Sequence, residues 1–190
     1  DQQFCLNGIP IKIKGINRHE SNPQTGYVLS VDDMEQDIRL IKQANFNFVR
    51  TAHYPNAPRW YHLCDQIGLL VMDEANVESH GLSYHQRVLP GDDPDWGAMA
   101  VDRIRHMVIR DRGHACVAIW SLGNEAGYGD SFYPMCEAVL ENDPEQRLIQ
   151  YADMNRVADM DSQTYPTPQW LEAHIAGTAV RKGEHGEEGS

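Results

Sequence analysis

The sequence has few of the features that would point to secretion or to a membrane. Its 190 residues include only four cysteines, at wide spacings and without a CxxC pair, and no secretory hydrophobic segment opens the chain. We therefore expect free, buried thiols and a protein of the reducing cytoplasm. No apolar run approaches the length of a transmembrane helix, so we expect no membrane-spanning segment.

Positive charge is also scarce. Sixteen Lys and Arg residues stand against 28 Asp and Glu residues, which gives a formal net charge of -12. Because no basic cluster offsets this charge, we expect neither nucleic acid nor an anionic membrane as a partner. A hydrophobic content of 41% is enough for the core of one domain. The chain begins at Asp1 without a methionine, which suggests a piece of a longer polypeptide.

The hydrophobic pattern predicts a hairpin followed by repeated βα units. Asn7-Gly8, within "FCLNGIPIKI", accepts positive φ at both centres of a tight turn. Short apolar segments then alternate with helical stretches, and we predict parallel strands at 13–17, 46–51, 69–74, 117–122, 148–151 and 162–165. The pattern indicates an α/β protein with a hairpin at 1–15, a βα domain at 16–178 and an acidic, glycine-rich tail at 179–190.

Three helix ends have local signals. Ser30 and Asp33 predict a capping box for a helix at 32–45. Ser131 is the expected cap of a later helix that begins near Phe132, and Gly68 stands where a helix C-cap belongs, just before a strand.

Polar residues gather at the carboxyl ends of the predicted strands. In a parallel α/β barrel this is the rim where the loops after the strands build the active site. The residues concerned are His19, Glu20, Arg50, His53, 73–80, Asn124, Glu125 and Tyr165.

The segment "DEANVESHG" has a spacing that suits metal ligands. Residues two apart in an extended chain point the same way, so Glu78 and His80 can converge on one ion. With Glu125 as a third ligand the donor set favours Mg²⁺ or Mn²⁺ over Zn²⁺. A hydrogen-bonded loop without a metal is the alternative interpretation.

Two histidines and an arginine occupy equivalent rim positions. His19 and His53, joined by Arg50, could bind sugar hydroxyls or stabilise a developing charge. A single histidine after a strand is more typical of a structural hydrogen bond than of a catalytic group, and Tyr165 by itself is more typical of packing at the edge of the core.

Glu125, in "SLGNEAGYG", ends a buried strand. Partial burial raises the pKa of a glutamate toward the value that a general acid needs near neutral pH, and Asn124 beside it can hold a substrate hydroxyl. A structural ion pair is the alternative.

Four motifs in order closely resemble the central domain of glycoside hydrolase family 2 β-galactosidases, over about residues 4 to 175. They are "GINRHE", "VRTAHYPN", "YHLCDQIGLLVMDEANVESHG" and "IWSLGNEAGYG". The resemblance implies a (β/α)₈ TIM barrel, incomplete here with about six βα units, and retaining hydrolysis of terminal β-galactosides. It also implies Mg²⁺ and, in the complete enzyme, Na⁺.

The resemblance also implies roles for the rim residues. Glu125 is similar to the acid/base and to a Mg²⁺ ligand, and the other two ligands correspond to Glu78 and His80. His19 and His53 correspond to the transition-state-stabilising histidines, and Asn124 and Tyr165 to residues near the sugar and the nucleophile. Arg50 corresponds to the residue that pairs with the nucleophile.

One element of the family pattern is missing. Retaining hydrolysis requires a second carboxylate, which the family carries in a motif like "CEYAHAMGN", and no such motif occurs here. We interpret Glu184, Glu187 and Glu188 as part of a solvated tail. We therefore expect residues 1–190 alone to be inactive, with the remaining domains of the same polypeptide and a homo-oligomer completing the enzyme.

Other functions stay open at this stage. β-Glucuronidase and β-mannosidase share the fold, although "SLGNEAGYG" and "DEANVESHG" favour a β-galactosidase. A non-catalytic module that binds sugar or a partner, and a hydrolase that activates water on a metal at Glu78 and His80, are alternatives from other classes.

Overall fold

The chain opens with a short hairpin. The computed structural model describes residues 3–80, 90–91, 93–152 and 154–179. Strands β1 (Cys5–Leu6) and β2 (Ile9–Pro10) pair antiparallel, and the turn between them has φ of 50° at Asn7 and 78° at Gly8. The predicted Asn-Gly turn is thus confirmed.

A parallel sheet of five strands forms the centre of the molecule. It consists of β3 (Gly15–Arg18), β4 (Phe48–Thr51), β5 (Leu70–Glu74), β6 (Val117–Ser121) and β7 (Leu148–Gln150). The strands lie side by side in the order of the sequence, each parallel to the next. This is the arrangement of successive barrel strands, and it confirms the predicted α/β class and the incomplete barrel.

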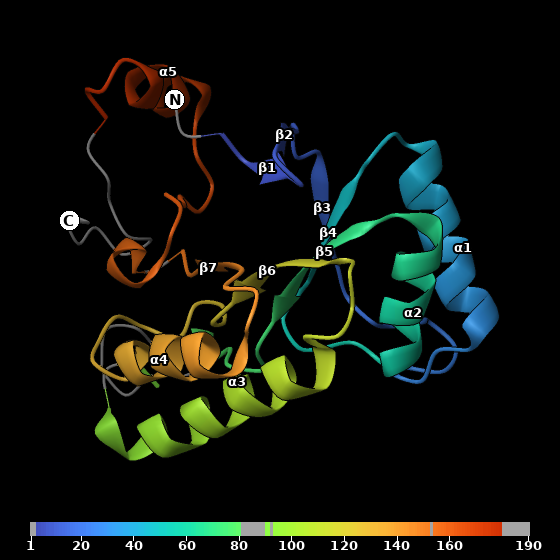
Figure 1. Cartoon of the computed structure of the whole chain (residues 1–190), viewed down its shortest axis with the longest axis horizontal. Coiled ribbons are helices and arrows are strands. Elements are labelled where there is room, and N and C mark those ends of the chain that lie inside the picture. Colours follow the sequence, from blue (N-terminus) through green and yellow to red (C-terminus); the bar gives the residue numbers. More distant parts are fainter. Residues whose placement is uncertain (1–2, 81–89, 92, 153, 180–190) are drawn as a thin grey trace.

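Helices connect the strands. They are α1 (Val31–Gln43), α2 (Pro58–Ile67), α3 (Gly97–Asp111), which follows the 3₁₀ turn η3 (Pro94–Trp96), α4 (Phe132–Asn142), the 3₁₀ turn η4 (Asn155–Val157) and α5 (Pro168–Ile175). Helices α1 to α4 lie along the right and lower sides of the curved sheet, whereas α5 lies apart from them at the upper left (Figure 1). Among the described residues, no helix combines the length and apolar character needed to span a bilayer.

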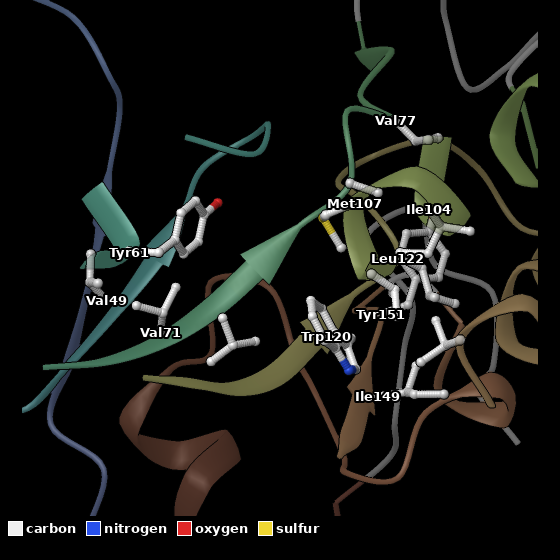
Figure 2. Packing of buried hydrophobic residues seen from close by; sticks show 14 of the residues in the cluster. Val49, Tyr61, Val71, Val77, Ile104, Met107, Trp120, Leu122, Ile149 and Tyr151 are labelled. Carbon is white, nitrogen blue, oxygen red and sulfur yellow. The ribbon is translucent and has the colours of Figure 1, made fainter. Parts of the chain in front are cut away.

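The two faces of the sheet differ in chemistry because side chains alternate along each strand. The outward side chains Val49, Val71, Trp120 and Ile149 pack with the helices in one hydrophobic cluster. Figure 2 shows Trp120 and Ile149, which are register partners on β6 and β7, in the same cluster as Ile104 and Met107 of α3. The inward side chains near the carboxyl ends are polar, and they are Asn17, Arg50, Glu74, Ser121 and Gln150.

The local helix signals are confirmed in part. The side chains of Ser30 and Asp33 form the predicted capping box of α1, and Gly68 is the left-handed C-cap of α2 with φ of 74°. Ser131 is the N-cap residue of α4, but its side chain makes no capping hydrogen bond. The four cysteines are free as expected, but only Cys64 and Cys116 are buried, whereas Cys136 is partly buried and Cys5 is exposed.

The predicted strand at 162–165 is wrong. This segment follows η4 without any strand pairing. The side chain of Asn155 accepts from the backbone N–H of Ser162 at 3.0 Å and donates to its carbonyl at 3.2 Å. Gln150 of β7 reaches the segment only through its side chain, which donates to Ser162 Oγ at 3.1 Å. The bonds from Asn155 satisfy the backbone N–H and carbonyl of Ser162, which a strand would have paired.

Candidate active site

A buried carboxylate, Glu74, lies at the centre of the polar inner face. Arg50 Nε donates to its Oε2 at 2.5 Å, and Ser121 Oγ lies 2.6 Å from the same oxygen. His53 Nδ1 is 2.7 Å from Oε1. The side chain of Glu74 is 0% exposed, and a charge removed from water to this extent is tolerated only with such partners. Glu74 therefore links the ends of β4, β5 and β6 and orients Arg50 and His53.

Arg50 also connects this network to the loop after β6. Its Nη2 donates to Asn124 Oδ1 at 2.9 Å. The backbone N–H of Asn124 donates to the carbonyl of Val77 at 2.9 Å, so the loops after β5 and β6 lie against each other. Gly123 permits this approach, because it has φ of 150° and an added Cβ would lie 2.3 Å from the Val77 oxygen.

Glu125 follows in an uncommon backbone conformation. Its φ of 44° lies in the left-handed region, which costs a residue other than glycine about 1–3 kcal/mol. Its side chain is 14% exposed and contacts His80 Nδ1 through Oε2. The backbone N–H of His80 in turn donates to Glu78 Oε1 at 3.4 Å. The structure thus brings together the three residues predicted to bind a metal.

The chemistry of this trio fits a hard divalent ion. Two carboxylates and one imidazole form a donor set that suits Mg²⁺ or Mn²⁺. A different group of described residues has the closer donor atoms. In His62, Asp65 and His114, one donor atom from each residue lies within 4.8 Å of the other two.

Of the remaining candidates, His19 and His53 lie on the same rim, whereas Tyr165 does not follow a strand of the sheet, because the predicted strand at 162–165 does not form. The rings of His19 and His53 are in edge contact, with centroids 5.3 Å apart. His19 is exposed, whereas the side chain of His53 is 25% exposed. Tyr165 is 82% exposed and has no hydrogen bond to the other candidates among the described residues. Glu184, Glu187 and Glu188 lie outside those residues.

Sequence reasoning did not single out Glu74 or Ser121 as site residues. Glu74 ends the apolar run "LLVMDE". A carboxylate at the end of a buried strand is the same signal that pointed to Glu125. Ser121 ends "VAIWS" without a charge or a motif of its own, and only its distance to Glu74 places it in the network.

A second buried acid, Asp73, lies next to Glu74 on the opposite face of the sheet. Burial, and then the charge of the neighbouring Asp111, raise the pKa of the Asp73 carboxyl well above its usual range. Tyr61 donates its hydroxyl to Asp73 at 2.6 Å, and Arg110 pairs with Asp111 at 2.6 Å. Asp73 therefore belongs to the packing of α2 and α3 against the sheet rather than to the rim.

Comparison with known proteins places these features in a family. The family model described as glycosyl hydrolases family 2, TIM barrel domain, matches residues 1–181. The chain is 51% identical over 151 residues to a beta-galactosidase from Photobacterium profundum, covering 80% of the chain and 14% of that protein. It is 50% identical over 141 residues to a beta-galactosidase from Pectobacterium atrosepticum, covering 74% and 13%. The chain thus spans about a seventh of the length of these curated relatives.

Solved structures show the same architecture. A crystal structure of Ruminococcus gnavus beta-glucuronidase superposes with a TM-score of 0.76 at 25% identity, covering 84% of the chain and 30% of that protein. A Bifidobacterium dentium beta-glucuronidase complexed with coumarin-3-O-glucuronide superposes with a TM-score of 0.69 at 29% identity, covering 84% and 27%.

Proposed function

The chain belongs to glycosyl hydrolase family 2, and from this premise we propose that it is part of the catalytic barrel of a retaining β-galactosidase. Curated relatives at about half identity are named beta-galactosidase, whereas the beta-glucuronidase structures share only 25% and 29% of residues. The difference in identity supports a β-galactoside substrate over a β-glucuronide.

The conformation of Glu125 is the observation that carries this proposal. A glutamate held at a left-handed φ, largely shielded from solvent and next to Asn124, is positioned rather than mobile. In our proposal it donates a proton to the glycosidic oxygen as the leaving group departs, and then takes a proton from the attacking water. Asn124 would hold a hydroxyl of the sugar while its Oδ1 stays bonded to Arg50.

Retaining hydrolysis also needs a nucleophilic carboxylate about 5–5.5 Å from the acid. Glu74 does not suit this role, because it is 0% exposed and bound by Arg50 and His53. Arg50 uses Nε for Glu74 and Nη2 for Asn124, which leaves N–H groups for a further carboxylate. We assign that carboxylate to a part of the longer polypeptide, and we assign His19 and His53 to binding and stabilising the sugar in the transition state.

For the metal we propose Mg²⁺, or Mn²⁺, with Glu78, His80 and Glu125 as ligands. When bound, the ion would hold the Glu125 carboxylate in place. Without an ion, the contact between Glu125 and His80 already holds the acid against the loop after β5. We further propose that the complete enzyme binds Na⁺, forms a homo-oligomer and is located in the cytoplasm.

A series of aryl β-galactosides with leaving groups of different pKa tests the role of Glu125 in the polypeptide that includes its remaining domains. Glu125→Gln should slow hydrolysis of poor leaving groups by about 10²–10⁴-fold and affect activated ones far less, because only the former need protonation. Glu141→Gln, the same change at an exposed position of α4, is the control. Equal losses across the series would contradict the acid role.

The same assay separates the alternatives. Faster turnover of aryl β-glucuronides or β-mannosides would reassign the substrate, and sugar binding without turnover would favour a non-catalytic module. Residues 1–190 alone should show no turnover, and activity of this chain that Glu125→Gln removed would refute the need for a carboxylate from elsewhere.

A further inference from the structure

A second group of metal-ligating side chains lies away from the rim. His62 and Asp65 are on α2, and His114 is in the loop that leads into β6. One donor atom from each residue lies within 4.8 Å of the other two. The loop before β6 is at the amino end of that strand, whereas the rim with Glu125 follows its carboxyl end. The two groups are therefore at opposite ends of the strand.

The local contacts orient two of the three side chains. His114 Nδ1 lies 2.6 Å from Asp65 Oδ2, and the backbone N–H of Cys116 donates to Asp65 Oδ1 at 2.7 Å. These two hydrogen bonds hold the Asp65 carboxylate and the His114 imidazole in a fixed relative orientation.

His62 completes the group. Its ring is in edge contact with that of His114, with centroids 4.7 Å apart. The side chain of His114 is only 14% exposed, whereas His62 is exposed and can change rotamer without disturbing the core. Ligands around one Zn²⁺ lie about 2.0–2.2 Å from the ion. Because its donor atom lies within 4.8 Å of those of Asp65 and His114, the exposed His62 is the side chain that would move to complete such a shell.

We propose that His62, Asp65 and His114 form a binding site for a transition-metal ion, best suited to Zn²⁺, that ties α2 to the loop before β6. Two imidazoles and one carboxylate suit Zn²⁺, whereas the trio at the rim, with two carboxylates, suits Mg²⁺. The ion would join segments about 50 residues apart in the sequence and leave a position for water. This site is independent of the proposed hydrolase function, because none of its residues belongs to the rim.

The decisive experiment measures Zn²⁺ binding to the full chain by titration calorimetry in excess Mg²⁺, which competes at the rim. Wild type should bind one more equivalent of Zn²⁺ than His62→Asn. Thermal melting should show a rise of about 5–10 °C when free Zn²⁺ is 100-fold above its dissociation constant, and His62→Asn should lose most of it. Because His62 is exposed, this variant should melt like wild type without metal.

Two controls make the result specific. His106→Asn changes another histidine paired with an aspartate, Asp102 at 3.2 Å, which among the described residues belongs to no group of three metal-ligating side chains, and it should keep the Zn²⁺ response. His80→Asn removes the rim ligand and should keep it as well. The proposal is overturned if His62→Asn binds as much Zn²⁺ as wild type.

Discussion

The buried carboxylate of Glu74 allows a quantitative test of the network under the rim. Glu74→Gln keeps the shape of the side chain but removes its charge, so the amide faces the N–H groups of Arg50 and His53 with one acceptor in place of two. Breaking a fully buried ion pair typically costs 3–5 kcal/mol. Arg50 is 20% exposed and keeps its bond to Asn124. We therefore expect Glu74→Gln to lower the free energy of unfolding by about 3 kcal/mol, the low end of this range.

Urea unfolding followed by circular dichroism measures this loss, which corresponds to a fall in melting temperature of about 6–12 °C. Glu35→Gln is the matched control, since it breaks an exposed pair with Arg39 at 3.7 Å and should change the free energy of unfolding by less than about 0.5 kcal/mol. A double-mutant cycle with Arg50→Met isolates the coupling between the two side chains. If Glu74→Gln were as mild as Glu35→Gln, or if the coupling were absent, the reasoning from burial would be refuted.

Two further changes test other parts of the structure. Gly123→Ala should lower the free energy of unfolding by at least about 1–3 kcal/mol, because its Cβ would collide with the Val77 oxygen at a strained φ. Gly113→Ala, with nothing within 4 Å, is its control, and equal unfolding midpoints for the two variants would contradict the close approach. Asp73, with its raised pKa in the folded state, contributes stability that is complete below the unfolded pKa of about 3.9 and is lost as pH rises through the folded pKa. Asp73→Asn should remove this fall in stability above about pH 4, and identical pH profiles of the unfolding midpoint for variant and wild type would argue against it.

Local signals predicted much of the fold. The Asn7-Gly8 turn, the capping box of α1 and the left-handed Gly68 are confirmed because each depends on residues within a few positions of one another. Five predicted strands are confirmed because each is a compact apolar run. The sixth is wrong because "SQTY" has a strand-like composition but its backbone bonds to Asn155, a competition that the run itself does not reveal.

The residues at the strand ends and the family motifs that contain them can be identified from the order of amino acids alone. Which of these residues contact one another depends on how the strands pair. Arg50 contacts Glu74 and Asn124, which are 24 and 74 positions away, and Ser121 reaches Glu74 across 47 positions. These pairings depend on the register between neighbouring strands, which shifts between Val71 and Met72 where β5 meets β6. Because a shift of one residue turns side chains to the other face, that register, which is set by packing across the whole sheet, determines which polar groups share the inner face.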